Sequence, residues 1–138
     1  MKELFVIDVI LDGCHTVKSA AGQVNMVLFH GSCDCDFFHG AILSGGVDTQ
    51  KYLTDQTGML SARYMLDGVD DAGNRTRIFI ENNGVTDEHG EMVTHPMILT
   101  DNARLSWLEQ AELTGRITGT PRGVMIHFYT EEESRHED

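Results

Sequence analysis

A period of two residues in the apolar pattern is the feature that most constrains how this chain can fold. Successive side chains of a β-strand point to opposite faces of a sheet, so this period indicates strands rather than helices. It is clearest in residues 110–118 and 122–130, where every second side chain is apolar or small. Further segments with strand character are 2–12, 23–30, two pieces within 40–52 around Gly45-Gly46, 59–67, 75–83 and 92–100.

These segments predict about nine short strands separated by glycine-rich turns, a pattern typical of a β-sandwich or a β-barrel. Residues 59–67 and 75–83 form a predicted hairpin, and Asn82-Asn83-Gly84 is interpreted as another turn. Several strands are apolar on both faces, which favours a barrel whose outer wall is covered by another subunit. Pro96 indicates an edge or a bulge in its strand.

A helical pattern occurs in residues 102–109, where Leu105 and Leu108 share a face and Asp101 is the expected N-cap. The chain has 138 residues, of which 41% are hydrophobic, and this suits one core. Residues 1–130 are therefore predicted to form a single domain. The charged tail 131–138 is expected to be disordered and solvated.

The strongly acidic composition of the chain disfavours binding to an anionic partner, so no such partner is expected. Ten basic and 22 acidic residues give a formal net charge of −12, which repels nucleic acids and anionic membrane surfaces. The sequence has no apolar run of membrane-spanning length and no signal-peptide pattern. Three cysteines without such a pattern suggest reduced thiols, so a cytoplasmic location is expected.

Several motifs resemble one family in their order and spacing. They are Gly31-Ser32, Gly40-Ala41-Ile42-Leu43-Ser44-Gly45-Gly46-Val47-Asp48, Leu60-Ser61-Ala62-Arg63-Tyr64-Met65-Leu66, Ile78-Phe79-Ile80-Glu81-Asn82-Asn83-Gly84-Val85, Trp107-Leu108, and Gly115 followed by 124–129. Over residues 4–130 the chain resembles the family called domain of unknown function 3237. The resemblance implies an all-β, lipocalin-like barrel of about 8–9 antiparallel strands, closed or nearly closed and oligomeric. It implies no established activity.

Asp48 and Arg63 are the first candidates for a binding site. Asp48 follows a glycine pair that permits close backbone approach, although a turn aspartate bonded to its own backbone is the alternative. Arg63 shares a face of its strand with Ser61 and Met65, and Tyr64 lies on the other face. If the Arg63 face points inward, the guanidinium needs a carboxylate such as Glu81; otherwise Arg63 is a surface residue.

His127 and Tyr129 complete the candidate set. A histidine titrates near neutral pH and can move a proton, although a hydrogen-bonded wall histidine is the alternative. Tyrosine hydroxyls supply hydrogen-bond donors to an otherwise apolar cavity. The predicted ligand-binding residues are therefore Asp48, Arg63, Glu81, His127 and Tyr129.

The segment from His30 to His39 contains Cys33 and Cys35 between two histidines. Structural zinc sites commonly use two thiolates two to four residues apart together with a second pair elsewhere. The Cys-x-Cys spacing and the lack of another cysteine pair favour structural thiols over a metal site. No phosphate loop, dinucleotide fingerprint or nucleophile motif is present in the sequence, so no cofactor is expected.

Three functions remain open from the sequence. The first is a barrel that binds a small apolar or aromatic acid, with Arg63 holding its carboxylate through two hydrogen bonds. The second is a cofactor-independent isomerase, cyclase or lyase that uses Asp48 or His127 for proton transfer. The third is a structural homo-oligomeric barrel without a ligand.

Overall fold

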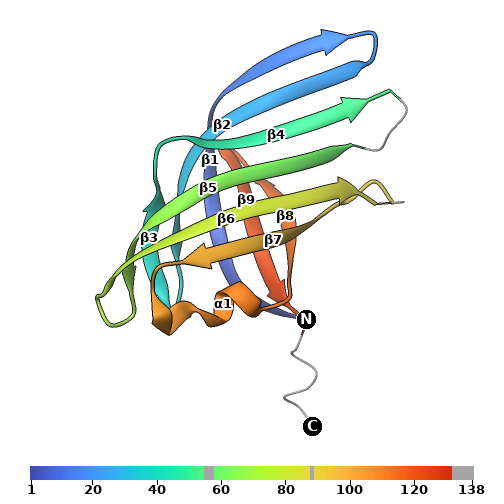
Figure 1. Ribbon diagram of the computed structural model, residues 1–138. Coiled ribbons are helices and arrows are strands. Elements are labelled where there is room, and N and C mark those ends of the chain that lie inside the picture. Colours follow the sequence, from blue (N-terminus) through green and yellow to red (C-terminus); the bar gives the residue numbers. More distant parts are fainter. Residues whose placement is uncertain (55–57, 88, 132–138) are drawn as a thin grey trace.

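The computed structural model describes residues 1–54, 58–87 and 89–131 and contains nine antiparallel strands that form a nearly closed barrel (Figure 1). The predicted fold class is confirmed. The ring runs β1-β9-β8-β7-β6-β5-β3-β2-β4, and the β1–β2 and β4–β5 pairings join its ends. The strands are β1 (Lys2–Ser19), β2 (Gly22–Asp34), β3 (Phe38–Ile42), β4 (Gly46–Leu53), β5 (Met59–Asp70), β6 (Arg75–Thr86), β7 (Met92–Thr100), β8 (Leu113–Thr120) and β9 (Gly123–Thr130).

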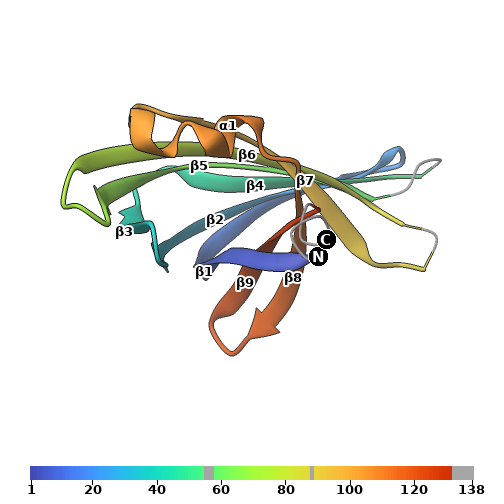
Figure 2. The same cartoon turned by 90° about the horizontal axis from the view of Figure 1, so that it is seen from below.

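The seam between β7 and β8 is the weakest part of the ring. The described residues pair only at Val93–Arg116 and Thr94–Gly115. Figure 2 shows β8 and β9 diverging from β7 beyond this short ladder. Pro96 lies past the last paired position, where its missing N–H breaks no bond to β8. The prediction that Pro96 marks an edge is confirmed.

The glycine pair separates two strands that share the same neighbours. β2 pairs with β4 through its first half and with β3 through its second half. Gly45 between them has a φ of 106°, a conformation that glycine adopts without steric strain. The prediction of two extended pieces around Gly45-Gly46 is confirmed.

The first hairpin is longer than the sequence pattern predicted. β1 continues to Ser19 and β2 begins at Gly22, so the two strands extend past the barrel (Figure 1). Residues 11–21 are exposed, which leaves no buried face to produce an apolar alternation there. A register shift between Leu11 and Gly13 marks the start of this exposed part of the hairpin, in which β2 stays paired with β4.

A short helical connection closes the opposite end of the barrel. It consists of the 3-10 helix η1 (Ala103–Leu105) and one turn of α-helix, α1 (Trp107–Gln110). Leu105 and Leu108, which the helical pattern places on one face, are both buried in the core. The expected cap is wrong, because Asn102 rather than Asp101 accepts from the Arg104 N–H. The Asp101 carboxylate instead accepts from the backbone N–H of Arg77 at 2.9 Å.

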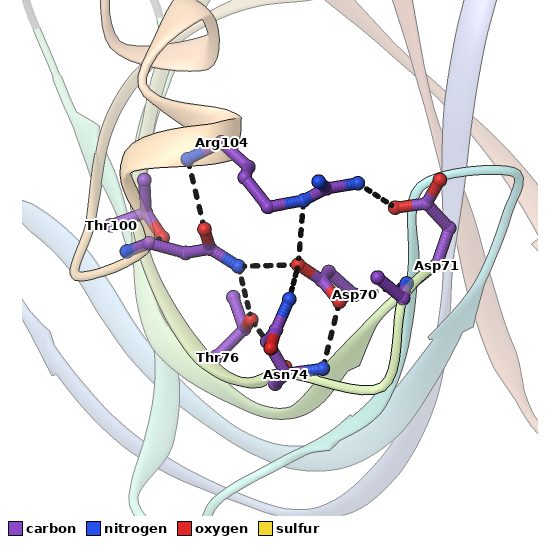
Figure 3. A network of polar contacts seen from close by, with 8 residues as sticks. Asp70, Asp71, Asn74, Thr76, Thr100 and Arg104 are labelled. Carbon is purple, nitrogen blue, oxygen red and sulfur yellow. Dashed lines mark hydrogen bonds and ion pairs between the residues drawn. The ribbon is translucent and has the colours of Figure 1, made fainter.

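A buried carboxylate ties this connection to the β5–β6 turn (Figure 3). Asp70 accepts hydrogen bonds from the backbone N–H groups of Ala72 (2.9 Å) and Asn74 (2.8 Å). It also accepts from the side chains of Asn74 (3.0 Å) and Asn102 (2.9 Å), and Arg104 Nε lies 3.2 Å away. These contacts, with the Asn74 side chain first, hold the pKa of Asp70 well below its ordinary value.

Only part of the barrel interior is filled by side chains. Near α1, the rings of Phe5 and Phe128 stack at 4.7 Å, and Phe37 meets Trp107 edge-on at 5.2 Å. Tyr64 is buried in this packed half. No helix in the described part of the chain has the length and apolar character needed to cross a bilayer. The predicted disordered tail falls almost entirely on residues 132–138, outside the described residues.

Candidate functional site

The other half of the barrel interior contains a cavity of about 540 Å³. This volume falls within the range of small-molecule pockets, roughly 300–1,000 Å³. The cavity lies on the side of the β1–β2 hairpin, away from α1 (Figure 1). Its wall is mostly apolar and is formed by Val9, Leu11, Gly13, Cys14, Asn25, Val27, Phe29, Asp48, Gln50, Leu60, Ala62, Asn82, Ile117, Val124 and Ile126.

Asp48 and Asn82 enter this cavity from strands on either side of β5. Strand register places Asp48 opposite Ala62 and Ala62 opposite Asn82, so all three share one row around the barrel. Two inter-strand spacings separate the backbones of Asp48 and Asn82 by about 10 Å. The methyl group of Ala62 leaves the space between the two polar side chains open.

The polar atoms of this row are buried without protein partners. Asn82 is 1% exposed, and neither its Oδ1 nor its Nδ2 has a hydrogen-bond partner. Asp48 Oδ2 accepts from Gln50 Nε2 at 2.9 Å, whereas Asp48 Oδ1 has no partner. Buried polar groups in proteins are nearly always hydrogen-bonded. One unpaired donor and two unpaired acceptors therefore belong to residues that line the cavity, and each of these atoms is itself buried.

Burial also changes the proton affinity of the acid. Desolvation raises the pKa of Asp48 above its ordinary value, and the Gln50 hydrogen bond opposes only part of this effect. A carboxyl group with a raised pKa beside an apolar cavity can hold a proton at higher pH than a surface aspartate.

Gly115 and Thr94 pack closely beside Asn82. Gly115 lies opposite Thr94 in the β7–β8 ladder. A Cβ at this position would collide with Thr94 Oγ1 and lie 3.5 Å from Asn82 Nδ2. Thr94 is fully buried, and its hydroxyl also lacks a partner. The close packing of β8 against Thr94, next to Asn82, thus depends on glycine at residue 115.

Arg63 and Glu81 lie on the outer surface instead. Tyr64 is the inward residue of this part of β5, so the neighbouring Arg63 points outward and its side chain is 59% exposed. Arg63 Nε contacts Glu81 Oε1 at 3.2 Å, and hydrogen bonds from Asn83 and Arg63 lower the pKa of Glu81. The hypothesis that opposite charges meet inside the barrel is wrong for this pair. The alternative of a surface arginine is the one observed.

His127 and Tyr129 also lie outside the barrel. Phe128 between them is fully buried, which turns both neighbours outward. His127 Nδ1 lies 2.9 Å from Glu3 Oε2, and its Nε2 lies 2.9 Å from Thr118 Oγ1. The structure therefore places one of the five predicted residues, Asp48, in the cavity and does not bring the other four to it.

Arg63 lines a second hollow of about 540 Å³, on the outer face of β4 to β7, together with residues such as Lys51 and His95. The buried unpartnered side-chain atoms of the described residues belong to Asp48, Tyr64, Asn82 and Thr94. None of these residues lines the outer hollow. The interior cavity is therefore the stronger candidate for a site.

The cysteine and histidine segment does not assemble into a metal centre. His30 contacts Asp12 at 2.7 Å and His39 contacts Asp34, so each histidine has its own carboxylate partner. Within the described residues, no group of three or more His, Cys, Asp or Glu is placed to hold a metal ion. The Cys33 thiol, hydrogen-bonded to Cys35, lowers the pKa of Cys35 to about 7, and the pKa of Cys33 is raised.

Asn82 is the site residue that sequence reasoning missed. Asn-Asn-Gly has the composition of a turn, but residues 82–84 continue β6. Thr76, Ile78 and Ile80 are the inward residues of this strand, and one more step of the same period reaches Asn82. Extending the alternation through the polar residues would have identified it.

No family model and no curated protein matches this chain. It is similar in structure to a protein of unknown function from Clostridium acetobutylicum ATCC 824, with 26% identity, coverage of 94% of this chain and 96% of that chain, and a TM-score of 0.78. A conserved protein of unknown function from Rhodopseudomonas palustris is 19% identical over 92% and 93% of the chains, with a TM-score of 0.75. A beta-barrel like protein from Acinetobacter baumannii AYE is 18% identical over 94% and 93%, with a TM-score of 0.72. These likenesses support the barrel fold and leave the more specific family resemblance a prediction.

Proposed function

We propose that the barrel binds a small, largely apolar molecule in its interior cavity and recognises one polar group of that molecule through Asp48 and Asn82. The observation that carries this proposal is the buried, unpartnered carboxamide of Asn82, a residue that lines the cavity. Leaving such a group unsatisfied costs about 1–3 kcal/mol. A ligand that completes its hydrogen bonds recovers that free energy.

The placement of charge changes the class of ligand expected from the sequence. A carboxylic acid held by Arg63 no longer fits, because the guanidinium is outside the barrel. Inside, Asp48 Oδ1 and Asn82 Oδ1 are acceptors and Asn82 Nδ2 is a donor. The polar end of the ligand is therefore a group that donates hydrogen bonds, such as a hydroxyl or an amine.

A thermal-shift screen of small alcohols, phenols and amines, followed by calorimetric titration, tests the proposal. Ala62→Phe is expected to abolish binding, because its ring fills the space between Asp48 and Asn82. The smaller Ala62→Leu serves where the phenylalanine variant does not fold. Arg63→Ala on the outer face is the control and leaves affinity unchanged. Binding that survives both Ala62 variants, or that depends on Arg63, would place the ligand elsewhere.

An enzymatic role of the same cavity is the second candidate, and the raised pKa of Asp48 favours it. A desolvated carboxyl group with a free oxygen can transfer a proton during isomerisation or lyase chemistry without a cofactor. If the bound molecule is converted, proton NMR of the mixture detects the product. At saturating ligand, Asp48→Asn then abolishes turnover, whereas unchanged turnover would exclude Asp48 as the proton-transfer group.

A further inference from the structure

We propose that the polar group recognised in the cavity is a protonated amine, seated over Ala62 between Asp48 and Asn82. This inference rests on the proposed binding function and narrows it to cationic ligands with an apolar body. It follows from the charges that line the cavity, from the geometry of its acceptors and from the charge of the whole molecule.

The first step is that Asp48 forms no ion pair with a basic side chain in the described part of the chain. Among the residues that line the cavity, only Asp48 and Cys14 carry ionisable side chains, and both are acids. None of the ion pairs formed within the described part of the chain includes Asp48. A buried carboxylate is strongly destabilised unless a charge or several hydrogen bonds compensate it. Its single side-chain hydrogen bond, from Gln50, leaves one oxygen for an external cation.

The second step is the number and spacing of acceptors. An ammonium group has three donors and no acceptor. Asp48 and Asn82 flank Ala62 on the two neighbouring strands, with their backbones about 10 Å apart, and each has an unpaired side-chain oxygen. In the proposed complex, one ammonium between these residues donates to both oxygens. A carboxylate in the same place would face Asp48 with like charge, and a hydroxyl would satisfy only one of the two acceptors.

The third step is that the rest of the molecule favours a cation. The net charge of −12 raises the local concentration of cations and repels anions at the surface. The apolar walls fit the hydrocarbon part of such a ligand. Phe29 is among these wall residues, and an aromatic ring attracts a nearby cation through its face.

Three probes that share an apolar body separate charge from shape. They are 2-phenylethylamine, 2-phenylethanol and phenylacetate. A second series carries the same three polar groups on a hexyl chain and tests a different apolar body. Isothermal titration at neutral pH is expected to give an affinity for the amines at least about tenfold above that for the alcohols. A factor of ten corresponds to about 1.4 kcal/mol, which is within the range of a charge-assisted hydrogen bond. The carboxylates are expected to bind weakest.

Asp48→Asn and Glu81→Gln form a matched pair of variants. Each removes one negative charge, and the first does so in the cavity while the second does so on the outer face. Asp48→Asn is expected to reduce amine affinity to the level of the alcohol and to leave alcohol affinity unchanged. Glu81→Gln is expected to leave both affinities unchanged.

The outcomes distinguish this inference from the function on which it rests. Alcohols that bind as tightly as amines, or equal losses in Asp48→Asn and Glu81→Gln, would overturn the amine assignment while binding in the cavity stands. If no compound of either series binds, or if Ala62→Phe does not affect those that do, the proposed function itself fails. Selective loss of amine affinity in Asp48→Asn alone supports the assignment.

Discussion

Replacing Asn82 by leucine is expected to stabilise the unliganded protein. Leucine branches at Cγ as asparagine does, so two methyl groups take the places of an oxygen and a nitrogen that have no partner. Removing one unsatisfied buried polar group recovers about 1–3 kcal/mol, and a well-shaped apolar replacement adds no new polar group. We therefore expect the free energy of unfolding to rise by about 1–3 kcal/mol.

Urea denaturation measures this change as a shift in midpoint at constant slope. For a domain of this size each kilocalorie corresponds to about 3–5 °C in Tm. Asn83→Leu is the matched control on the same strand, because Asn83 is exposed and accepts from Ser61 Oγ at 2.6 Å. Asn83→Leu is expected to give no gain.

The same Asn82 variant is expected to lose ligand affinity, so stability and binding change in opposite directions. That opposition is the signature of a polar group kept unpaired for a ligand. A loss of stability of about 1 kcal/mol or more in Asn82→Leu would refute the reasoning. It would mean that the folded protein already satisfies the carboxamide.

Three further predictions concern charge and association. Because burial raises the pKa of Asp48, its ionisation destabilises the folded protein as pH rises from the unfolded value of about 3.9 through the folded pKa. Asp48→Asn should raise the urea midpoint near neutral pH and have no effect at about pH 3, and an equal gain at both would contradict this origin. The lowered pKa of Asp70 acts in the opposite direction, since its stabilisation is present above the unfolded pKa and is lost as pH falls below it. Asp70→Asn should lower Tm at neutral pH and flatten the acid side of the curve of Tm against pH; a parallel curve would count against Asp70. Finally, Leu99 is 54% exposed on the outer face, and sedimentation velocity should show an oligomer that Leu99→Glu dissociates; a monomeric wild type would exclude self-association.

The period-two pattern predicted the architecture because one buried face dictates where apolar residues fall. It failed where that constraint is absent. Residues 11–21 have no buried face, so their strands carry no alternation to recognise. In β5, either face had a composition compatible with burial, and the packing of Tyr64 decides which one points inward. That choice also decides the position of Arg63, which the sequence left open.

The candidate site was harder to predict than the fold. The glycines before Asp48 indicate a site residue, whereas the composition of residues 82–84 indicates a turn and hides Asn82. Asp48 on β4 and Asn82 on β6 lie on either side of Ala62 only because of the strand register. Register depends on long-range pairing, which a local pattern does not contain.

The most direct test of the interior site is an NMR titration of the labelled protein with 2-phenylethylamine and with 2-phenylethanol. We expect saturable shifts of the Asn82 side-chain NH₂ and the Ala62 methyl resonances, with the Arg63 Nε–H unaffected. Shifts confined to Arg63, Asn83 and their outer-face neighbours, with Asn82 and Ala62 unchanged, would contradict binding inside the barrel.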